Sequence, residues 1–511
     1  MATSAFFGLD VGTSSTKAVL VSHDGSVLDS RTREHEVERL AHGVVQMDMT
    51  IWWKEFQELY GDLVRSNSVR IEGIGVSGMG PCIGVASEGR PIAPAALYGV
   101  DYRARTEIEE LAAELGQLEL LKRYDSQLTS QAGGPKLLWF AKRYPEAFAR
   151  GVRFYMPSSW IIQHLTGEYV LDRHSASQCT PLYDPQTQEW DTDMAERLAH
   201  GTELPRLGWS NEVCARTQEL SDLPELEAGI PVIFGSIDAW AEQESVGATE
   251  IGELFLMYGT TLFLIANSGD RLRHASMWGT TGTRRGTRNL AGGLATSGAL
   301  TQWFREISGV REYTALIEAA EQVAPGSDGL LTLPYFAGER TPIQDPDARG
   351  VMIGLTLEHG RGHLYRSLLE ATAFAVRHNI EVMERAGASI HSITAAGGGV
   401  GSDLWPQIVS DVTGRPQHIH RYSVGAAYGD AFMTAEALGV VDDLDEWNPV
   451  EKTIEPRETP VYDALYEDYR SLYEATAEIQ HHMAGVAERT GHTPDQPEHI
   501  TSPNITTEEQ A

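Results

Sequence analysis

The sequence predicts an α/β protein made of two halves that begin alike, and one repeated pattern leads to this conclusion. Near the N-terminus an apolar strand ending at Asp10 is followed by a polar turn, Gly12-Thr13-Ser14, and a second apolar strand. From Phe255 to Ile265 the same order returns, with the turn Gly259-Thr260-Thr261. Strands that alternate with helices follow, as in α/β domains, and 511 residues suffice for two of them.

The remaining elements follow from the spacing of apolar residues. Runs with helical spacing alternate with short apolar runs that are bounded by glycine, proline and polar turn residues. In the first half this pattern predicts strands up to residue 10, at 17–22 and at 71–78, and a helix at 50–64. In the second half it predicts a strand at 391–399 and helices at about 359–386, 402–413, 425–439 and 460–485.

The chain is strongly acidic, with 72 Asp and Glu against 40 Lys and Arg and a net charge of -32. Nucleic acids and anionic membranes require a positive surface, so neither is expected as a partner. No apolar run approaches the roughly 18 residues of a membrane-spanning helix, and no signal-peptide pattern opens the chain. The three cysteines lie far apart, which argues against a disulfide framework or a thiolate metal site. We therefore expect a cytoplasmic protein.

Asp10 and the turn that follows it suggest phosphate chemistry. The carboxylate ends a strand, and the backbone N–H groups and hydroxyls of the next residues can surround phosphate oxygens. A carboxylate beside a phosphate implies Mg²⁺ between them. A plain hairpin turn is the alternative, and the local sequence leaves both open.

Two further glycine-rich segments extend this hypothesis. The turn at 259–261 alone resembles an ordinary hairpin, but paired with the first turn it could clamp a polyphosphate from the opposite side. The strand at 391–396 runs into Gly397, Gly398 and Gly399, whose bare backbone lets a flat base or ribose approach. Close packing without a ligand is the competing explanation for these three glycines.

Asp238 follows an apolar strand and precedes a helix. In α/β proteins this is where ligands bind, at the carboxyl end of a strand. An Asp in this position also serves as a helix N-cap, and the two roles are compatible.

Beyond these patterns the chain resembles the FGGY family of carbohydrate kinases. The most specific match is the segment from Gly350 through Met352 and Gly354, followed by His363-Leu364-Tyr365-Arg366-Ser367-Leu368-Leu369-Glu370, which is similar to the family's C-terminal signature. Gly338-Glu339-Arg340-Thr341-Pro342 also resembles the family, whereas the segment from Lys136 keeps part of its N-terminal signature. The resemblance spans about residues 5–440.

The resemblance implies two ribonuclease H-like domains, as in the superfamily of actin, Hsp70 and hexokinase, with ATP and sugar in the cleft between them. It implies a sugar-binding and catalytic-base domain at 1–248 and a nucleotide-binding domain at 249–488. The polar residues 489–511 are expected to form a disordered tail.

The resemblance also assigns roles by position. Asp10 is similar to the Mg²⁺-associated aspartate and Asp238 to the catalytic base. The residues expected to bind ATP are Gly12, Thr13, Ser14, Ser15, Thr16 and Lys17 in the first turn, Gly259, Thr260 and Thr261 in the second, and Gly397, Gly398 and Gly399 in the adenosine motif. The sugar pocket is expected to use Gln46, Asp48, Met79, Tyr98, Asp101 and Arg103, together with Asp238.

The substrate and the rival interpretation remain open. Xylulokinases show other residues around Met79 and Tyr98, and an Asn where this chain has Ala239, while glycerol kinases differ further. A pentulose such as xylulose or ribulose, or a related polyol, is the expected class. The alternative is a chaperone-like or filament-forming ATP-binding protein of the same superfamily, which uses ATP as a switch. Family habit suggests a homodimer.

Overall fold

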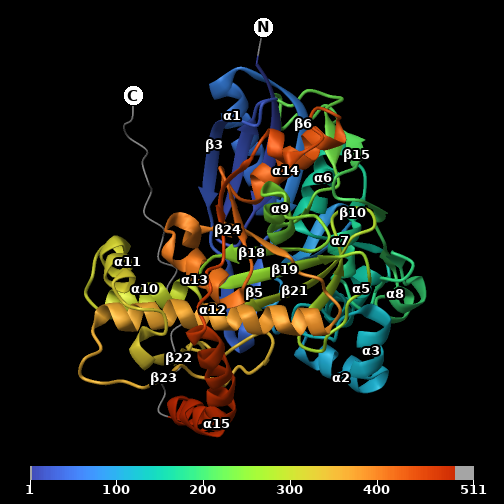
Figure 1. Ribbon diagram of the computed structural model, residues 1–511. Coiled ribbons are helices and arrows are strands. Elements are labelled where there is room, and N and C mark those ends of the chain that lie inside the picture. Colours follow the sequence, from blue (N-terminus) through green and yellow to red (C-terminus); the bar gives the residue numbers. More distant parts are fainter. Residues whose placement is uncertain (1–2, 490–511) are drawn as a thin grey trace.

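The computed structural model describes residues 3–489 and shows two α/β domains (Figure 1). The first domain is built on a seven-stranded sheet in the order β15-β16-β6-β1-β2-β3, with β17 beside β6. Its strands are β1 (Thr3–Val11), β2 (Ser15–Val21), β3 (Val27–Glu34), β6 (Val69–Gly78), β15 (Val213–Arg216), β16 (Pro231–Ile233) and β17 (Ser236–Ile237). Strands β1, β2 and β3 form an antiparallel meander, and β6 joins β1 in parallel.

The second domain repeats this plan. Its seven-stranded sheet has the order β20-β21-β19-β18-β24-β25-β26. The strands are β18 (Glu253–Tyr258), β19 (Leu262–Ser268), β20 (Trp278–Thr281), β21 (Arg288–Leu294), β24 (Ser392–Gly397), β25 (Gln417–His420) and β26 (Val450–Ile454). Again the first two strands are antiparallel, and the first strand pairs in parallel with a later one, β24. The predicted repeat of two similar halves is confirmed.

The first domain carries a large insertion that forms a second layer. A six-stranded sheet has the order β13-β9-β7-β8-β5-β4, with β4 (Glu38–Leu40), β5 (Val44–Met47), β7 (Ile83–Ser87), β8 (Arg90–Ala96), β9 (Val152–Tyr155) and β13 (Thr202–Glu203). The helices of this domain are α1 (Thr50–Asn67), α2 (Arg105–Leu115), α3 (Gln117–Tyr124), α4 (Gly133–Arg143), α5 (Pro145–Phe148), α6 (Pro157–Thr166), α7 (Arg173–Ser177), α8 (Thr192–Leu198) and α9 (Asp238–Ser245). Short pairs join β10 (Val170–Asp172) to β14 (Arg206–Gly208) and β11 (Tyr183–Asp184) to β12 (Glu189–Trp190).

Four helices of the second domain agree with the predicted ones, and the two at 298–307 and 313–321 were not predicted. The helices of this domain are α10 (Gly298–Ile307), α11 (Tyr313–Glu321), α12 (Arg361–Arg385), α13 (Leu404–Thr413), α14 (Ala426–Ala437) and α15 (Val461–Arg489), with a small sheet of β22 (Leu331–Leu333) and β23 (Val351–Ile353). One boundary differs: a 3₁₀ turn, Gly398–Gly401, follows β24, so α13 begins at Leu404. None of the helices described within residues 3–489 is long and apolar enough to cross a membrane.

The two domains exchange helices. Helix α9 follows the first sheet, but its Trp240 and the preceding Ile237 of β17 pack in one cluster with Phe255, Ile265 and Ala291 of the second sheet. Conversely, α14 follows the second sheet and packs its alanines and aromatic residues against Phe6, Val19 and Val21 of the first. The two helices also contact each other closely, because Gly429 of α14 has no side chain to keep the carbonyl of Ala241 away.

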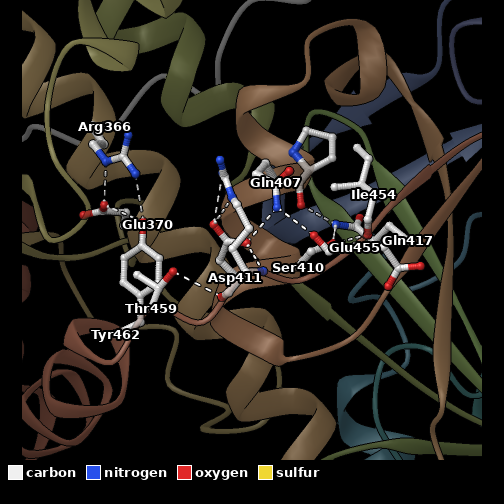
Figure 2. A network of polar contacts seen from close by, with 12 residues as sticks. Arg366, Glu370, Gln407, Ser410, Asp411, Gln417, Ile454, Glu455, Thr459 and Tyr462 are labelled. Carbon is white, nitrogen blue, oxygen red and sulfur yellow. Dashed lines mark hydrogen bonds and ion pairs between the residues drawn. The ribbon is translucent and has the colours of Figure 1, made fainter.

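A buried polar network fastens α12 to α15 in the second domain (Figure 2). The Arg366 Nε donates to Glu370 Oε1 at 2.8 Å, and the Tyr462 hydroxyl donates to the same oxygen at 2.9 Å. The backbone N–H of Gly326 and the hydroxyl of Ser327 also donate to Glu370. Glu370, which ends the family-like segment, therefore has a structural role in this domain.

The predicted tail falls largely outside the described residues. Helix α15 extends to Arg489, and residues 490–511 are beyond the part of the chain that the structure describes.

Candidate active site

Three carboxylates gather where the first sheet meets α9. Asp10 lies near the end of β1, in register with Ser77 of β6, and Ile237 of β17 pairs with Gly78 on the other side of β6. Asp238 is the next residue, and Glu242 lies one helical turn later on the same face of α9. All three side chains are only partly buried. Parallel strand ends thus bring together residues that are far apart in the sequence.

The charges of these carboxylates act on one another. Burial raises the pKa of Asp10, and the nearby carboxylates of Asp238 and Glu242 raise it further. Burial also raises the pKa of Asp238. For Glu242, burial and then Asp238 raise the pKa to about 7. The repulsion among these carboxylates is relieved when a positive charge lies close to them.

The Asp238 side chain does not act as the N-cap of α9. Asp238 is the first residue of α9, and the N-cap position is Ile237, which makes no side-chain cap. Its Oδ1 accepts only a hydrogen bond from the N–H of the adjacent Ala239, at 2.8 Å. The capping interpretation is therefore not supported at this position, and the carboxylate can serve a ligand.

Lys17 supplies the nearest positive charge and bridges the domains. It faces Asp10 across the β1–β2 pair, and its Nζ donates to the carbonyl of Val424 in the second domain at 2.6 Å. Burial lowers its pKa, whereas Asp10 and then Glu242 act to raise it. The side chain therefore belongs at the same time to the carboxylate cluster and to the contact between domains.

The side chains of His35 and Thr16 support the first predicted phosphate turn. His35 Nε2 lies 3.0 Å from the carbonyl of Gly12, and its Nδ1 lies 2.9 Å from Glu55 Oε2. Thr16 is fully buried and donates its hydroxyl to the same carboxylate. The Thr16 side chain thus supports the turn from inside, unlike the partly or fully exposed residues Gly12, Thr13, Ser14 and Ser15. The hydroxyl of Thr13 lies 3.0 Å from that of Tyr98.

The second turn and the triple glycine lie side by side. Tyr258, the last residue of β18, pairs with Gly397 at the end of β24, so Gly259 begins next to Gly397. A side chain at Gly397 or Gly399 would collide with Tyr258. The backbone N–H groups of Ser297, Gly298 and Ala299 donate to the carbonyls of this turn and thereby fix it to the start of α10. Thr260 is exposed, and Gly259, Thr261 and Gly398 are likewise accessible.

Three of the predicted sugar-binding residues, Gln46, Asp101 and Arg103, bind one another. Asp101 and Arg103 form a buried ion pair at 2.9 Å, Arg103 also donates to Gln46, and Asp101 accepts from the N–H of Val45. These contacts support the local fold. Asp48 accepts from the N–H of Thr50 at the start of α1, and Met79 is buried.

Arg340, which was not predicted as a site residue, interacts electrostatically with Tyr98 of the first domain. The pKa of Arg340 is lowered by burial, while Glu339, Tyr98 and Tyr102 act in the opposite direction. Its guanidinium lies 5.4 Å from the ring centre of Trp278. Glu339 holds this segment through the N–H groups of Ala295 and Arg340. The segment 338–342 was noticed only for its resemblance, because no local pattern marks an arginine that reaches another domain.

Sequence reasoning also missed Glu242, Ser77 and Asp430. Glu242 could have been found from its i+4 spacing to Asp238 on one helix. Ser77 Oγ lies 2.6 Å from Asp430 Oδ2 and 3.3 Å from Asp10 Oδ1. Burial raises the pKa of Asp430 well above its usual range, and Ser77 links this α14 side chain to Asp10 of the site.

The comparisons with known proteins agree with this arrangement. Models of the N-terminal and C-terminal domains of the FGGY family of carbohydrate kinases match residues 5–242 and 254–438. The chain belongs to the FGGY family of carbohydrate kinases. The predicted family and fold class are thereby confirmed, as is the prediction that the protein is a kinase.

Individual relatives include kinases for two different substrates. A xylulose kinase from Escherichia coli is 26% identical over 92% of this chain and 98% of its own length. A glycerol kinase from Saccharopolyspora erythraea is 30% identical over 84% of this chain and 89% of its own length. The crystal structure of xylulose kinase from Rhodospirillum rubrum covers 93% of this chain and 100% of its own, with 30% identity and a TM-score of 0.85. Family membership therefore fixes the class of reaction, and these relatives leave the sugar undecided.

Proposed function

We propose that the protein transfers the γ-phosphoryl group of MgATP to a hydroxyl of a small sugar or polyol, with Asp238 as the general base. The observation that supports this most directly is the meeting of Asp238, Asp10 and Lys17 beside the turn at 12–15. Phosphoryl transfer depends on alignment and on neutralisation of charge, and these groups can contribute to both. The chaperone-like alternative has no observation in its favour.

The nucleotide would lie between the two turns. Gly12, Thr13, Ser14 and Ser15 would offer N–H groups and hydroxyls to the phosphates from the first domain. Gly259, Thr260 and Thr261 would do so from the second, and Gly397 to Gly399 would leave room for the adenosine. Thr16 is left out of the proposed contacts because its hydroxyl is engaged with Glu55.

Asp10 is the proposed ligand of a divalent cation, together with phosphate and water oxygens, because within the described residues no three His, Cys, Asp or Glu side chains lie close enough together to hold a metal ion. Burial raises the pKa of Asp10, Asp238 and Glu242, and Asp238 raises the pKa of the other two further. Lys17 acts to lower the pKa of Asp10 and of Glu242. Asp10 would hold Mg²⁺, and Glu242 could approach it through water. When bound, the ion would neutralise charge on the transferring group.

Asp238 would act on the acceptor. Its carboxylate would take the proton from the attacking hydroxyl, a contribution of roughly 10²–10⁴-fold in rate. The sugar would lie near Tyr98, with Arg340 and Tyr102 at the far side. A pentulose or a related polyol stays the proposed class, by analogy with the xylulose kinases that the chain resembles.

The decisive test is Asp238→Asn, assayed by ADP release across pentuloses, polyols and aldonates. We expect one sugar class to be turned over by the native protein, with the variant retaining nucleotide binding and losing transfer by roughly a hundredfold or more. Asp193→Asn, at an exposed position of α8, is the control and should keep its rate. Near-native transfer in Asp238→Asn would exclude this residue as the base.

A further inference from the structure

A cavity lies in the second domain, away from the carboxylate cluster. It has a volume of about 360 Å³ and lies between α12, α15 and the segment that follows β22. Helix α12 contributes His378, Val382 and Arg385, which share one face of the helix at positions i, i+4 and i+7. A cavity of this size is sufficient for a small organic molecule.

The floor of the cavity is aromatic. Tyr469 and Tyr473 lie one turn apart on α15, and Tyr335 packs beside them with ring centres 6.3 and 5.6 Å away. The hydroxyls of Tyr335 and Tyr469 are 2.6 Å apart, which fixes both rings. Pro342 and Ile343 add an apolar wall. Rings held in this way offer a flat surface for a flat or ring-shaped ligand.

One arginine on the rim of the cavity, Arg385, has no ion-pair partner among the described residues. The Arg385 side chain donates only from Nε to the carbonyl of Glu381, at 3.1 Å, and within residues 3–489 no carboxylate lies in ion-pair distance of it. Arg470 lies 3.7 Å from Glu381, and Glu474 is the acidic residue on the rim. Arg385 also contributes to lowering the pKa of His274 and His378.

His378 is a polar group without a partner. Its side chain is 8% exposed and lines the cavity, and its Nδ1 makes no hydrogen bond to any described residue. Burial, together with Arg470 and Arg385, keeps this imidazole neutral, so one ring nitrogen carries a proton that it can donate. Buried polar groups in native proteins are nearly always satisfied, and an unpartnered one beside a cavity points to a ligand.

We propose that this cavity binds a small organic anion, with its carboxylate or phosphate on Arg385 and His378 and its flat body on the three tyrosines. Arg385 would supply the charge, His378 one hydrogen bond, and the aromatic floor the apolar contact. This assignment depends on the cavity alone and holds whichever sugar the kinase accepts.

The site also has a direct link to the domain junction. Pro342 and Ile343 line the cavity, and Arg340, two residues before Pro342, interacts electrostatically with Tyr98 of the first domain. Thr341 anchors the segment between them by hydrogen bonds with Gly293 and Asn379. An anion in the cavity would therefore act on the position of Arg340 through two residues of chain.

Binding can be measured by isothermal titration with four probes. Phenyl phosphate and benzoate carry an anion on a ring, inorganic phosphate lacks the ring, and phenol lacks the charge. We expect phenyl phosphate or benzoate to bind with roughly millimolar affinity or better, and inorganic phosphate and phenol to bind at least tenfold more weakly. The stronger of the two anions identifies a phosphorylated or a carboxylated metabolite as the natural class.

Two variants test the site, and a third controls for charge. Arg385→Gln and His378→Phe should each weaken binding of the better probe by roughly ten- to a hundredfold, because a charge-assisted or buried hydrogen bond is lost. Arg361→Gln, at the opposite end of α12, should bind as the native protein does. Circular dichroism must show that the variants are folded. Equal affinity in the native and Arg385→Gln proteins, or no binding of either ring anion, would refute the site.

Discussion

His35 and Glu55 are joined beneath the first phosphate turn. His35 Nε2 lies 3.0 Å from the Gly12 carbonyl, and its Nδ1 lies 2.9 Å from Glu55 Oε2. Glu55 also accepts a hydrogen bond from the Thr16 hydroxyl. Because Glu55 belongs to α1, this pair ties the turn to that helix.

Loss of this brace should weaken nucleotide binding selectively. His35→Phe keeps an aromatic ring but removes both hydrogen bonds, so we expect the KM for ATP to rise roughly tenfold while the KM for the sugar stays within about twofold. Steady-state kinetics with each substrate varied in turn measures the two values. His23→Phe, which breaks an exposed pair with Glu72, is the matched control. A similar rise in both KM values would instead indicate a general loss of structure.

The pH dependence of the reaction should reflect the raised pKa of Asp238. A general base acts in its ionised form, and burial raises the pKa of this carboxyl above its usual range. Activity is therefore expected at and above neutral pH, and to be lost as the pH falls through the raised pKa, well above the ordinary value of about 4. A profile of kcat/KM for the sugar at saturating ATP measures this limb. An acid limb at the ordinary value would contradict the assignment.

The unpredicted Glu242 should matter for the metal ion. Glu242→Gln keeps the shape of the side chain but removes one of three neighbouring charges. We expect the Mg²⁺ concentration for half-maximal rate to rise severalfold, with the KM for the sugar little changed, because a carboxylate near the cation is lost. Titration of the rate with Mg²⁺ at fixed ATP tests this. Glu250→Gln, near the end of the segment that follows α9, should behave as the native protein.

Arg284 should be a main determinant of stability at the domain junction. It forms ion pairs with Glu244 of α9 at 2.6 Å and Glu436 of α14 at 2.5 Å, and the Glu244 side chain is completely buried. Arg284→Met would leave that charge without its partner and should lower the free energy of unfolding by about 3–5 kcal/mol. The neighbouring Arg285→Met breaks an exposed pair with Glu212 and should cost less than about 1 kcal/mol. Urea unfolding of both variants distinguishes these values, and equal losses would disprove the role of Arg284.

Close contact between the exchanged helices can be tested at Gly429. A methyl group there would lie 1.8 Å from the carbonyl oxygen of Ala241, so Gly429→Ala must push α14 away from α9. We expect a loss of about 1–3 kcal/mol in the free energy of unfolding, together with reduced turnover. Gly360→Ala, where a methyl group meets open space, is the control. Unchanged stability in Gly429→Ala would show that the helices can separate freely.

Local patterns were sufficient for the strands that begin each half, for the long helices α1, α12, α14 and α15 and for the two turns, but not for the six-stranded sheet of the first domain. Apolar alternation and glycine placement depend on neighbouring residues, so the repeated start of each half was visible in the sequence. Asp10 and Asp238 were found because each ends a strand. The roles of Asp101 and Thr16 were not visible, since their partners Arg103 and Glu55 are recognisable only once the chain has folded. The same is true of Arg340 and Asp430, whose contacts join different domains.

The position of α14 on the first sheet has a consequence for how the protein is made. The apolar side of that sheet, with Phe6, Val19 and Val21, is covered by residues 426–437. During translation this apolar surface stays uncovered until nearly the whole chain has left the ribosome. A shortened chain that ends before α14 would therefore expose the apolar face of this sheet to chaperones and proteases. If the two halves are produced as separate chains, each should be stable only when it is bound to the other.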